Sequence, residues 1–280
     1  MSSATRTSNT AGAATYIWLV LAAVVLLFPV LLTVAGGFLP LGELVREPPA
    51  LFGGSYTLGN YLSAIAEQTV PLIPAMVNSL FVGFVIMLGQ LVTSCLAAYG
   101  LVFVKTPLRK PLFWVFLATV MIPYEAIVVP NALFIRSLGV QDSHWSLVLP
   151  FLANGFGIFL MRQSFLQFPT ELRQAAALDG CGHLRFLATI VVPATRPSIT
   201  ALAVWSFLQG WNMYFWPLII SASNNSLNTL QTAVFALKSN ETANPGLILA
   251  GVTITLIPTL LLVIFGQRWL VRGFTAGAVK

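Results

Sequence analysis

The chain has 280 residues, of which 57% are hydrophobic and only 8% are charged. Soluble globular domains carry about 25% charged residues, and a soluble fold of this composition would expose large contiguous apolar patches to water. A soluble protein is therefore excluded. The net charge of +6 at pH 7 needs no nucleic-acid partner, because loop charges of a membrane protein account for it.

The chain contains six stretches that are long and apolar enough to cross a bilayer. A helix needs roughly 20 mostly apolar residues to span about 30 Å of hydrocarbon. The predicted spans are residues 16–38, 77–104, 112–133, 146–165, 199–222 and 247–269. The first run is longer than the roughly 7–15 residues of a signal-peptide core, so we expect a retained helix. The expected fold class is all-α and polytopic.

Basic residues are distributed unevenly between the predicted loops. If the N-terminus faces the cytoplasm, all but three of the 14 lysines and arginines lie inside, the exceptions being Arg46, Arg136 and Lys238. Five acidic residues fall outside: Glu43, Glu47, Glu67, Asp142 and Glu241. The positive-inside rule then predicts that both termini lie in the cytoplasm.

The spans divide the chain into a tail (1–15), a first transmembrane helix (16–38), an external loop (39–71), a five-helix core (72–270) and a cytoplasmic tail (271–280). Prolines and glycines argue against a long regular element in the external loop, and an asparagine-rich second external loop is expected at 223–245. Prolines also occur within spans, at positions 123, 130, 217 and 258. They mark either broken helices that line a path or ordinary membrane-helix prolines.

The longest predicted cytoplasmic connection, residues 166–197, contains two short helices. Thr170 can cap the first helix, Glu171 suits its positive N-terminus, and Gly180 can end it. A second amphipathic stretch follows at 183–189. Two short helices joined by a glycine elbow form a compact knob, which suits transmission of motion from a soluble partner. The less specific alternative is a pair of amphipathic helices that lie at the membrane interface.

Residues for catalysis or metal binding are missing from the pattern. Neither His144 nor His183 has a partner at metal-ligand spacing, and Cys95 and Cys181 form no framework. A P-loop requires a lysine directly after a glycine, and none of the four lysines is preceded by glycine, so the chain has no ATPase motif of its own. An intramembrane enzyme would need a nucleophile and a base on facing helices, and the sequence offers no such pair. An ion-coupled secondary transporter needs ionisable groups within the bilayer, and Glu125 is the one clear candidate.

The sequence QAAALDG at 174–180, followed by IVVP at 190–193, resembles the "EAA…G…I-x-LP" loop of permease subunits of binding-protein-dependent ABC importers. Similarity extends from about residue 78 to 274 through PLR (107–109), FW (113–114), MIPYE (121–125) and GWNMYFWP (210–217). These segments and the tail TAGAVK (275–280) are similar to the carbohydrate-uptake, MalG-like branch, and within it to glycerol-3-phosphate permeases.

The resemblance implies a type I ABC importer permease fold in the inner membrane of a bacterium. It implies three kinds of protein partner besides lipid: a second homologous permease, two ATPase subunits that hold ATP and Mg, and an extracytoplasmic solute-binding protein. No cofactor is expected in this chain. The implied solute is glycerol-3-phosphate or a glycerophosphodiester such as glycerophosphocholine. A sugar or oligosaccharide is the alternative, and an ion-coupled transporter is a distant one.

The resemblance also assigns candidate residues. The ATPase-coupling residues are Glu171, Gln174, Ala175, Ala176, Asp179 and Gly180. Gln174 replaces the family's glutamate, so an ion pair with the ATPase becomes a neutral hydrogen bond, for which Glu171 can substitute. Ile127 stands where a basic residue is expected in glycerol-3-phosphate permeases. The tail from Thr275 to Lys280 is expected to reach the ATPase subunits.

Four residues are candidates for the solute path: Glu125, Trp211, Asn212 and Tyr214. Aromatic faces and amides suit polyols, but Trp and Tyr near a span end more often anchor the membrane interface. For Glu125, a buried carboxyl bonded to a neighbouring helix is an equal alternative. We expect a structural role for Trp216, and we give Asn78 and Ser79 at the mouth of the second span less weight as path residues.

Overall fold

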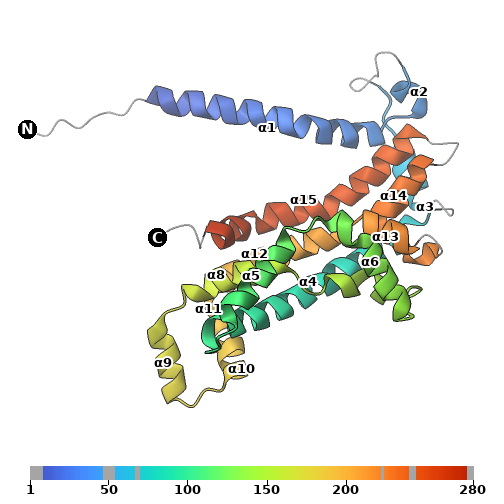
Figure 1. Ribbon diagram of the computed structural model, residues 1–280. Helices are drawn as coiled ribbons and strands as arrows, with labels where there is room; N and C mark the ends of the chain where they lie inside the picture. The colour runs from blue at the N-terminus through green and yellow to red at the C-terminus, as the bar shows by residue number, and fades with distance from the viewer. Residues whose placement is uncertain (1–8, 47–53, 67–69, 222–223, 240–243, 276–280) are drawn as a thin grey trace, which may run out of the picture. The chain divides into compact units, whose positions relative to one another are not determined.

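The computed structural model describes residues 9–46, 54–66, 70–221, 224–239 and 244–275, and these ranges contain helices and connections but no strand (Figure 1). They divide into two compact units, one made of Met1–Val70 with Val234–Leu256 and the other of Pro71–Ala233 with Ile257–Lys280. The all-α prediction is confirmed.

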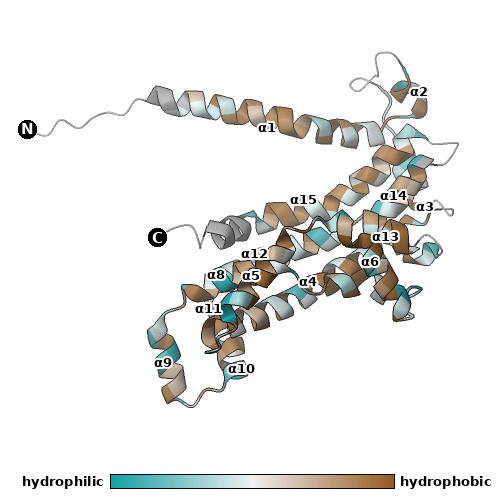
Figure 2. Ribbon diagram, viewed as in Figure 1, coloured by the Kyte–Doolittle hydropathy of each residue, from teal (hydrophilic) through white to brown (hydrophobic). Residues whose placement is uncertain are grey.

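Among the described residues, three helices are long and apolar enough to cross a membrane uninterrupted. They are α1 (Asn9–Gly37), α4 (Leu72–Phe103) and α15 (Pro245–Thr275), and Figure 2 shows their mainly hydrophobic residues. They correspond to the predicted first, second and sixth spans. The α15 helix continues to Thr275, so the predicted tail 271–280 begins inside it, and Lys280 lies outside the described residues.

The other three predicted spans are broken, which hydropathy alone does not predict. Of the prolines expected to mark either breaks or ordinary membrane helices, Pro123 lies at a break, whereas Pro130, Pro217 and Pro258 lie inside helices. The third consists of α5 (Arg109–Val120) and α6 (Tyr124–Ser137), which meet at 101°. The fourth consists of α7 (Trp145–Val148) with the 3-10 turn η1 (Leu149–Phe151), then α8 (Gly155–Leu166), bent by 48°. The fifth consists of α12 (Arg196–Trp211) and α13 (Phe215–Ile220), with a short non-helical break between them, and its 87° bend lies before α12, where residues 183–194 meet residues 196–220. Counting each bent pair as one span gives up to six.

The first unit is organised around Asn60. This residue lies in the first turn of α3 (Gly59–Ala66), and its side-chain amide nitrogen donates to the carbonyl oxygens of Gly37 (3.1 Å), the last residue of α1, and of Leu39 (2.8 Å). The Phe38 ring packs on Tyr61 with centroids 4.7 Å apart. The predicted loop 39–71 therefore contains two short helices, α3 and α2 (Leu41–Leu44), of which α3 is hydrogen-bonded to the chain after α1.

The predicted loop 223–245 also contains helical structure. A 3-10 turn, η4 (Asn225–Leu227), precedes the ten-residue helix α14 (Leu230–Ser239). The α14 side chains of Leu230, Ala233, Val234 and Leu237 are buried. This i, i+3, i+4, i+7 spacing is that of one apolar helix face, so the sequence of the asparagine-rich loop contains the pattern of a helix.

The second unit is built on α4, which packs against α8 and α12. At the crossing of α4 and α12, a Cβ added at Gly210 would lie 2.9 Å from the Gly83 Cα. Helices approach this closely in membranes where glycines replace larger side chains. Beyond the ends of these helices, two short helices (yellow in Figure 1), α9 (Thr170–Leu178) and α10 (His183–Phe186), project together.

Candidate functional site

The first candidate site is the knob of residues 170–194, which begins with α9. The predicted helix is confirmed, but Pro169 rather than Thr170 occupies the N-cap position, and the Thr170 hydroxyl donates to the Glu171 carboxylate at 3.3 Å. Gly180 ends the helix with φ +67°. The N–H of Gly180 donates to the carbonyl of Ala177 (3.1 Å) and that of Cys181 to the carbonyl of Ala176 (2.9 Å). This is a Schellman motif, which requires the left-handed conformation at Gly180.

The second arm of the knob is a nearly continuous helix. It consists of α10, a π-helical turn η2 (Leu187–Val191) and α11 (Val192–Ala194), and it meets the α12–α13 stretch at 87°. The Tyr99 hydroxyl on α4 and Nδ1 of His183 are hydrogen-bonded at 2.7 Å. The predicted second helix is thus confirmed and longer than the 183–189 expected.

The knob is attached to the end of α4 by packing and by one charged hydrogen bond. Phe103, the last residue of α4, lies with its ring centroid 5.1–5.9 Å from those of four other aromatic rings: Tyr99, Phe165, Phe168 and Phe186. The Arg173 guanidinium donates to the Phe103 carbonyl at 2.8 Å and lies 5.5 Å from that ring. A cation at a helix C-terminus is favoured by the helix dipole. The sequence pattern gave Arg173 no role.

One coupling candidate lies on the inner side of the knob. Ala176 is only 6% exposed and belongs to the aromatic cluster around Phe103, so its place in the motif is explained by packing. The side chains of Glu171, Gln174, Ala175 and Asp179 are exposed, as is Gly180.

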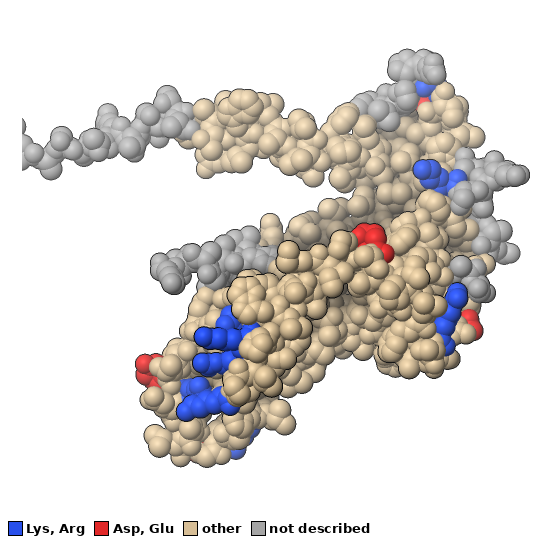
Figure 3. All heavy atoms as spheres, viewed as in Figure 1, with Lys and Arg blue, Asp and Glu red and all other residues tan. Residues whose placement is uncertain are grey.

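The outer side of the knob also exposes apolar side chains that the motif did not single out. Leu178 is 89% exposed and Leu184 is 74% exposed. Figure 3 shows lysines and arginines (blue) gathered at the same end of this unit. An exposed surface of leucines, alanine and short polar groups on a firmly held helix suits docking of another protein.

The second candidate site is the region where the three broken spans meet. Tyr124 begins α6, Phe151 ends η1, and Met213 lies between α12 and α13, and all three pack on one buried cluster that includes Trp216. The Phe151 ring lies 5.8 Å from Tyr124 and 5.6 Å from Trp216. Broken membrane helices are tolerated only where protein or a water-filled cavity surrounds their backbone, and such breaks often line solute sites.

Two path candidates lie at these breaks with polar groups exposed. Glu125 is in the first turn of α6, and its side chain is exposed within this chain. Asn212 follows α12 and is exposed, and its side-chain oxygen Oδ1 accepts from the side-chain Nε2 of Gln231 at 3.4 Å. Tyr214 in the same break is half-buried.

The other aromatic candidate is a core residue. Trp211 is 0% exposed and stacks on Phe207 with centroids 6.1 Å apart, so it lines no open path in this chain. Trp216 is also 0% exposed, and its indole N–H donates to the Ser146 carbonyl at 3.0 Å, so the expected structural role is confirmed.

Polar residues of α4 support the broken chain. The Gln90 amide donates to the Phe151 carbonyl at 2.9 Å, and the Thr93 hydroxyl lies 2.9 Å from the Leu152 carbonyl. The Asn154 side chain accepts from the N–H groups of Phe156 (2.7 Å) and Gly157 (3.4 Å). These bonds satisfy backbone groups that a break would otherwise leave unpaired. In the sequence, polar residues that stand alone in an apolar span are the pattern that could have indicated these supporting bonds.

Asn78 and Ser79 have structural contacts at the other end of α4. The Asn78 amide donates to the carbonyls of Ser226 (2.7 Å) and Asn228 (2.9 Å), while the Ser79 hydroxyl accepts from the Leu230 N–H (2.8 Å). These bonds hold the chain that leads into α14.

Within the described ranges, no group of three or more His, Cys, Asp or Glu side chains could hold a metal ion.

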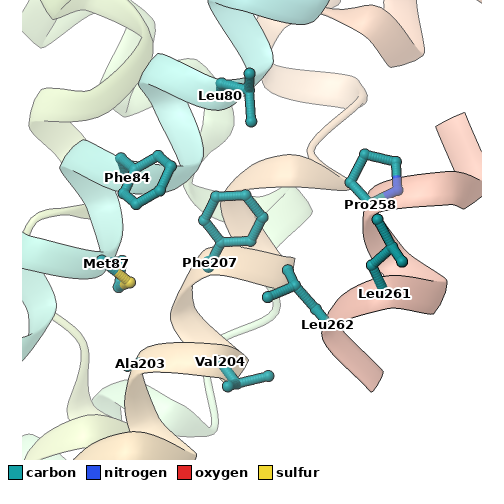
Figure 4. A pocket seen from close by; sticks show the side chains of 9 residues that line it. All are labelled: Leu80, Phe84, Met87, Ala203, Val204, Phe207, Pro258, Leu261 and Leu262. Atoms are coloured by element: carbon teal, nitrogen blue, oxygen red, sulfur yellow. The ribbon is translucent and has the colours of Figure 1, made fainter. Parts of the chain in front are cut away.

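A cavity of about 310 Å³ lies between α4, α12 and α15. Its nine lining side chains are all apolar, and Figure 4 shows Phe84, Phe207 and Leu262 among them. A charged or hydroxylated solute would lose its hydration there without gaining hydrogen bonds. This cavity is therefore not a candidate solute site.

Broken spans around a polar-edged cluster, joined to a firmly held helical knob, define a membrane permease that a soluble partner drives. The chain belongs to the family described as binding-protein-dependent transport system inner membrane component, whose model matches residues 90–276. It is therefore the transmembrane permease subunit of an ABC importer and an inner-membrane protein.

Similar proteins agree with this family. The chain is 34% identical over 267 residues to the sn-glycerol-3-phosphate transport system permease protein UgpE of Pectobacterium atrosepticum, covering 92% of this chain and 94% of that protein. It is 33% identical to UgpE of Escherichia coli O1:K1, covering 91% and 92%. A bacterial ABC transporter involved in the import of the acidic polysaccharide alginate has the same fold, with a TM-score of 0.80 at 18% identity, over 96% of this chain and 99% of that one.

Proposed function

We propose that this permease pairs with a second, homologous permease and that two ATPase subunits dock on the knobs of the pair. A solute-binding protein delivers the solute from outside, and both termini face the cytoplasm. ATP binding closes the ATPase subunits, moves the knobs and opens the path outward, and hydrolysis resets it. The uneven loop charges support the orientation, and the exposed outer side of the knob supports the docking.

The proposed coupling contact uses the exposed groups of the knob. Glu171, Gln174, Ala175 and Asp179 face outward beside Leu178, while Arg173 and Ala176 bind the inner side to the permease core. The Gln174 amide offers the ATPase a neutral hydrogen bond, and Glu171 one turn earlier offers the charge that Gln174 lacks. A force on the outer side would pass through Arg173 to the end of α4.

We propose that the solute is glycerol-3-phosphate or a glycerophosphodiester. The single observation that carries this proposal is the similarity, over more than nine-tenths of the chain, to permeases named for sn-glycerol-3-phosphate. A phosphate favours arginine or lysine partners, whereas the broken-span region offers Glu125, Asn212 and the half-buried Ile127. A zwitterionic diester such as glycerophosphocholine fits this surface better, because its ammonium group can approach Glu125 and Tyr214.

The solute proposal is tested by the ATPase rate of the reconstituted transporter. Binding protein loaded with glycerol-3-phosphate, glycerophosphocholine or a disaccharide is added in parallel. We expect the phosphate compounds to stimulate ATP hydrolysis and the disaccharide to leave it at the basal rate. Stimulation by the disaccharide alone would overturn the assignment in favour of a sugar.

A matched pair of variants then tests the role of Glu125. If Glu125 faces the choline ammonium, Glu125→Gln should lower stimulation by glycerophosphocholine about fivefold and leave stimulation by glycerol-3-phosphate unchanged, since a charge pair of about 1 kcal/mol is lost. Asp142→Gln is the control, because Asp142 is exposed in a connection outside the broken-span region. If Glu125→Gln changed the stimulation by the two solutes equally, this role would be contradicted.

Removal of residues 276–280 tests the proposed contact of the tail with the ATPase. Deleting them leaves α15, which ends at Thr275, intact, so the complex should assemble normally and its ATPase rate should change severalfold. A control variant keeps the length and replaces Lys280 with serine. An unchanged ATPase rate after the deletion would show that the tail makes no functional contact.

A further inference from the structure

A groove and a basic cup adjoin each other on the α4–α5 hairpin. The groove, of about 250 Å³, is lined by α4 residues from Leu96 to Val104 and by Leu112 and Phe116 of α5. The cup, of about 580 Å³, is lined by Lys105, Thr106, Pro107, Arg109 and Lys110 in the connection between the helices and at the start of α5. Thr106 lines both, so the apolar groove lies next to the cationic space.

The groove is open because α4 has a glycine there. A Cβ added at Gly100 would meet no atom within 4 Å, in contrast to the crowded glycines at the α4–α12 crossing. Leu96, Val104 and Leu112 are exposed along its edges. Because this groove lies along a membrane-spanning helix, the protein needs something apolar to fill it.

The cup carries positive charge without a counter-charge. Lys105, Arg109 and Lys110 are exposed, and no aspartate or glutamate is among the residues that line this space. None of the three forms a salt bridge to another residue of the described ranges. The Thr106 hydroxyl accepts from the Leu108 N–H at 3.3 Å, which fixes the turn of the connection.

We propose that this combined site binds one anionic phospholipid, with an acyl chain in the groove and the headgroup phosphate in the cup. Basic pockets at the cytoplasmic ends of membrane helices select anionic headgroups, and the groove explains why the ligand is a lipid rather than a free anion. An acidic surface of the ATPase could pair with the cup but could not enter the groove within the span. This proposal rests on the membrane location of the chain and not on the solute, so each can fail separately.

The test uses the complete transporter in nanodiscs that hold phosphatidylglycerol and phosphatidylethanolamine in equal amounts. Native mass spectrometry counts the lipids that remain bound after release. We expect phosphatidylglycerol to be retained preferentially. Arg109→Gln with Lys110→Gln should lower its retention by about fivefold per charge removed. Arg136→Gln with Lys238→Gln is the matched control, because both residues are exposed and lie outside the cup and outside the knob.

Gly100→Leu separates a lipid site from a simple anion site. The new side chain has room and should fill the groove without disturbing the fold, so phosphatidylglycerol retention should fall at least as far as in the double charge variant. Retention unchanged by either variant would overturn the proposal. So would displacement of the lipid by millimolar inorganic phosphate, which would indicate a free-anion site. Loss of ATPase subunits from the double charge variant would assign the cup to the ATPase instead.

Discussion

Replacing Gly180 with leucine is expected to uncouple ATP hydrolysis from transport. Gly180 has φ +67°, a conformation that costs an L-residue roughly 1–2 kcal/mol, and the Schellman bonds at the end of α9 depend on it. Rearrangement of this elbow would turn the outer side of α9 away from its docking position. We expect solute uptake to fall about tenfold, as that free energy implies, and the ATPase rate to become insensitive to the binding protein.

Two further variants isolate the backbone conformation as the cause. Gly180→Asn should retain most uptake, because asparagine tolerates left-handed φ better than leucine does. Gly182→Ser should be almost neutral, because Gly182 has φ −67° and open space and occupies the N-cap position of α10, which serine favours. A well-assembled Gly180→Leu complex with normal solute-stimulated ATPase activity would contradict the coupling role of the elbow.

The knob was predictable from sequence because its signals are local. Glutamate in the first turn and glycine at position 180 mark both ends of α9 within one stretch of chain, although the N-cap residue is Pro169 and not the expected Thr170. The attachment was not predictable, because it depends on Arg173 meeting the Phe103 carbonyl 70 positions away. The same holds for Tyr99 and His183.

The breaks were hidden for a related reason. Residues 112–133 are mostly apolar, and a proline alone does not distinguish a kink from the 101° turn at Met121–Pro123. The turn is stable only because Tyr124 and Val128 find a cluster contributed by other spans. By contrast, α14 has an apolar spacing that is local and readable, but the asparagines on both sides of it favour a loop.

The segment GWNMYFWP at 210–217 contains both core residues and candidates for contact with solute. Gly210 permits the α4–α12 crossing, Trp211 is buried beside it, and Trp216 is bonded to Ser146. Only Asn212 and Tyr214, in the break between them, remain as candidates for contact with solute. The aromatic residues that suggested a polyol site are therefore mostly parts of the core.

Substituting Gly210 is accordingly expected to damage assembly rather than specificity. A Cβ at this position would lie 2.9 Å from the Gly83 Cα and 3.2 Å from the Val82 carbonyl oxygen, and backbone atoms of a packed helix cannot move aside cheaply. Overpacking costs about 1–3 kcal/mol in a close-packed core. We expect Gly210→Ala to lower the thermal midpoint of the purified complex and Gly210→Leu to prevent its accumulation in the membrane.

Comparison with Gly83 makes this prediction specific to the backbone contact. A Cβ at Gly83 would lie 2.9 Å from the Phe207 ring, which is a side chain that can turn toward the apolar cavity beside it. Gly83→Ala should therefore be milder, and adding Phe207→Leu should restore its thermal midpoint. The same addition should not restore Gly210→Ala, because the Gly83 backbone stays in place. Normal accumulation of Gly210→Leu, or rescue of Gly210→Ala by Phe207→Leu, would show that the two helices do not cross on these glycines.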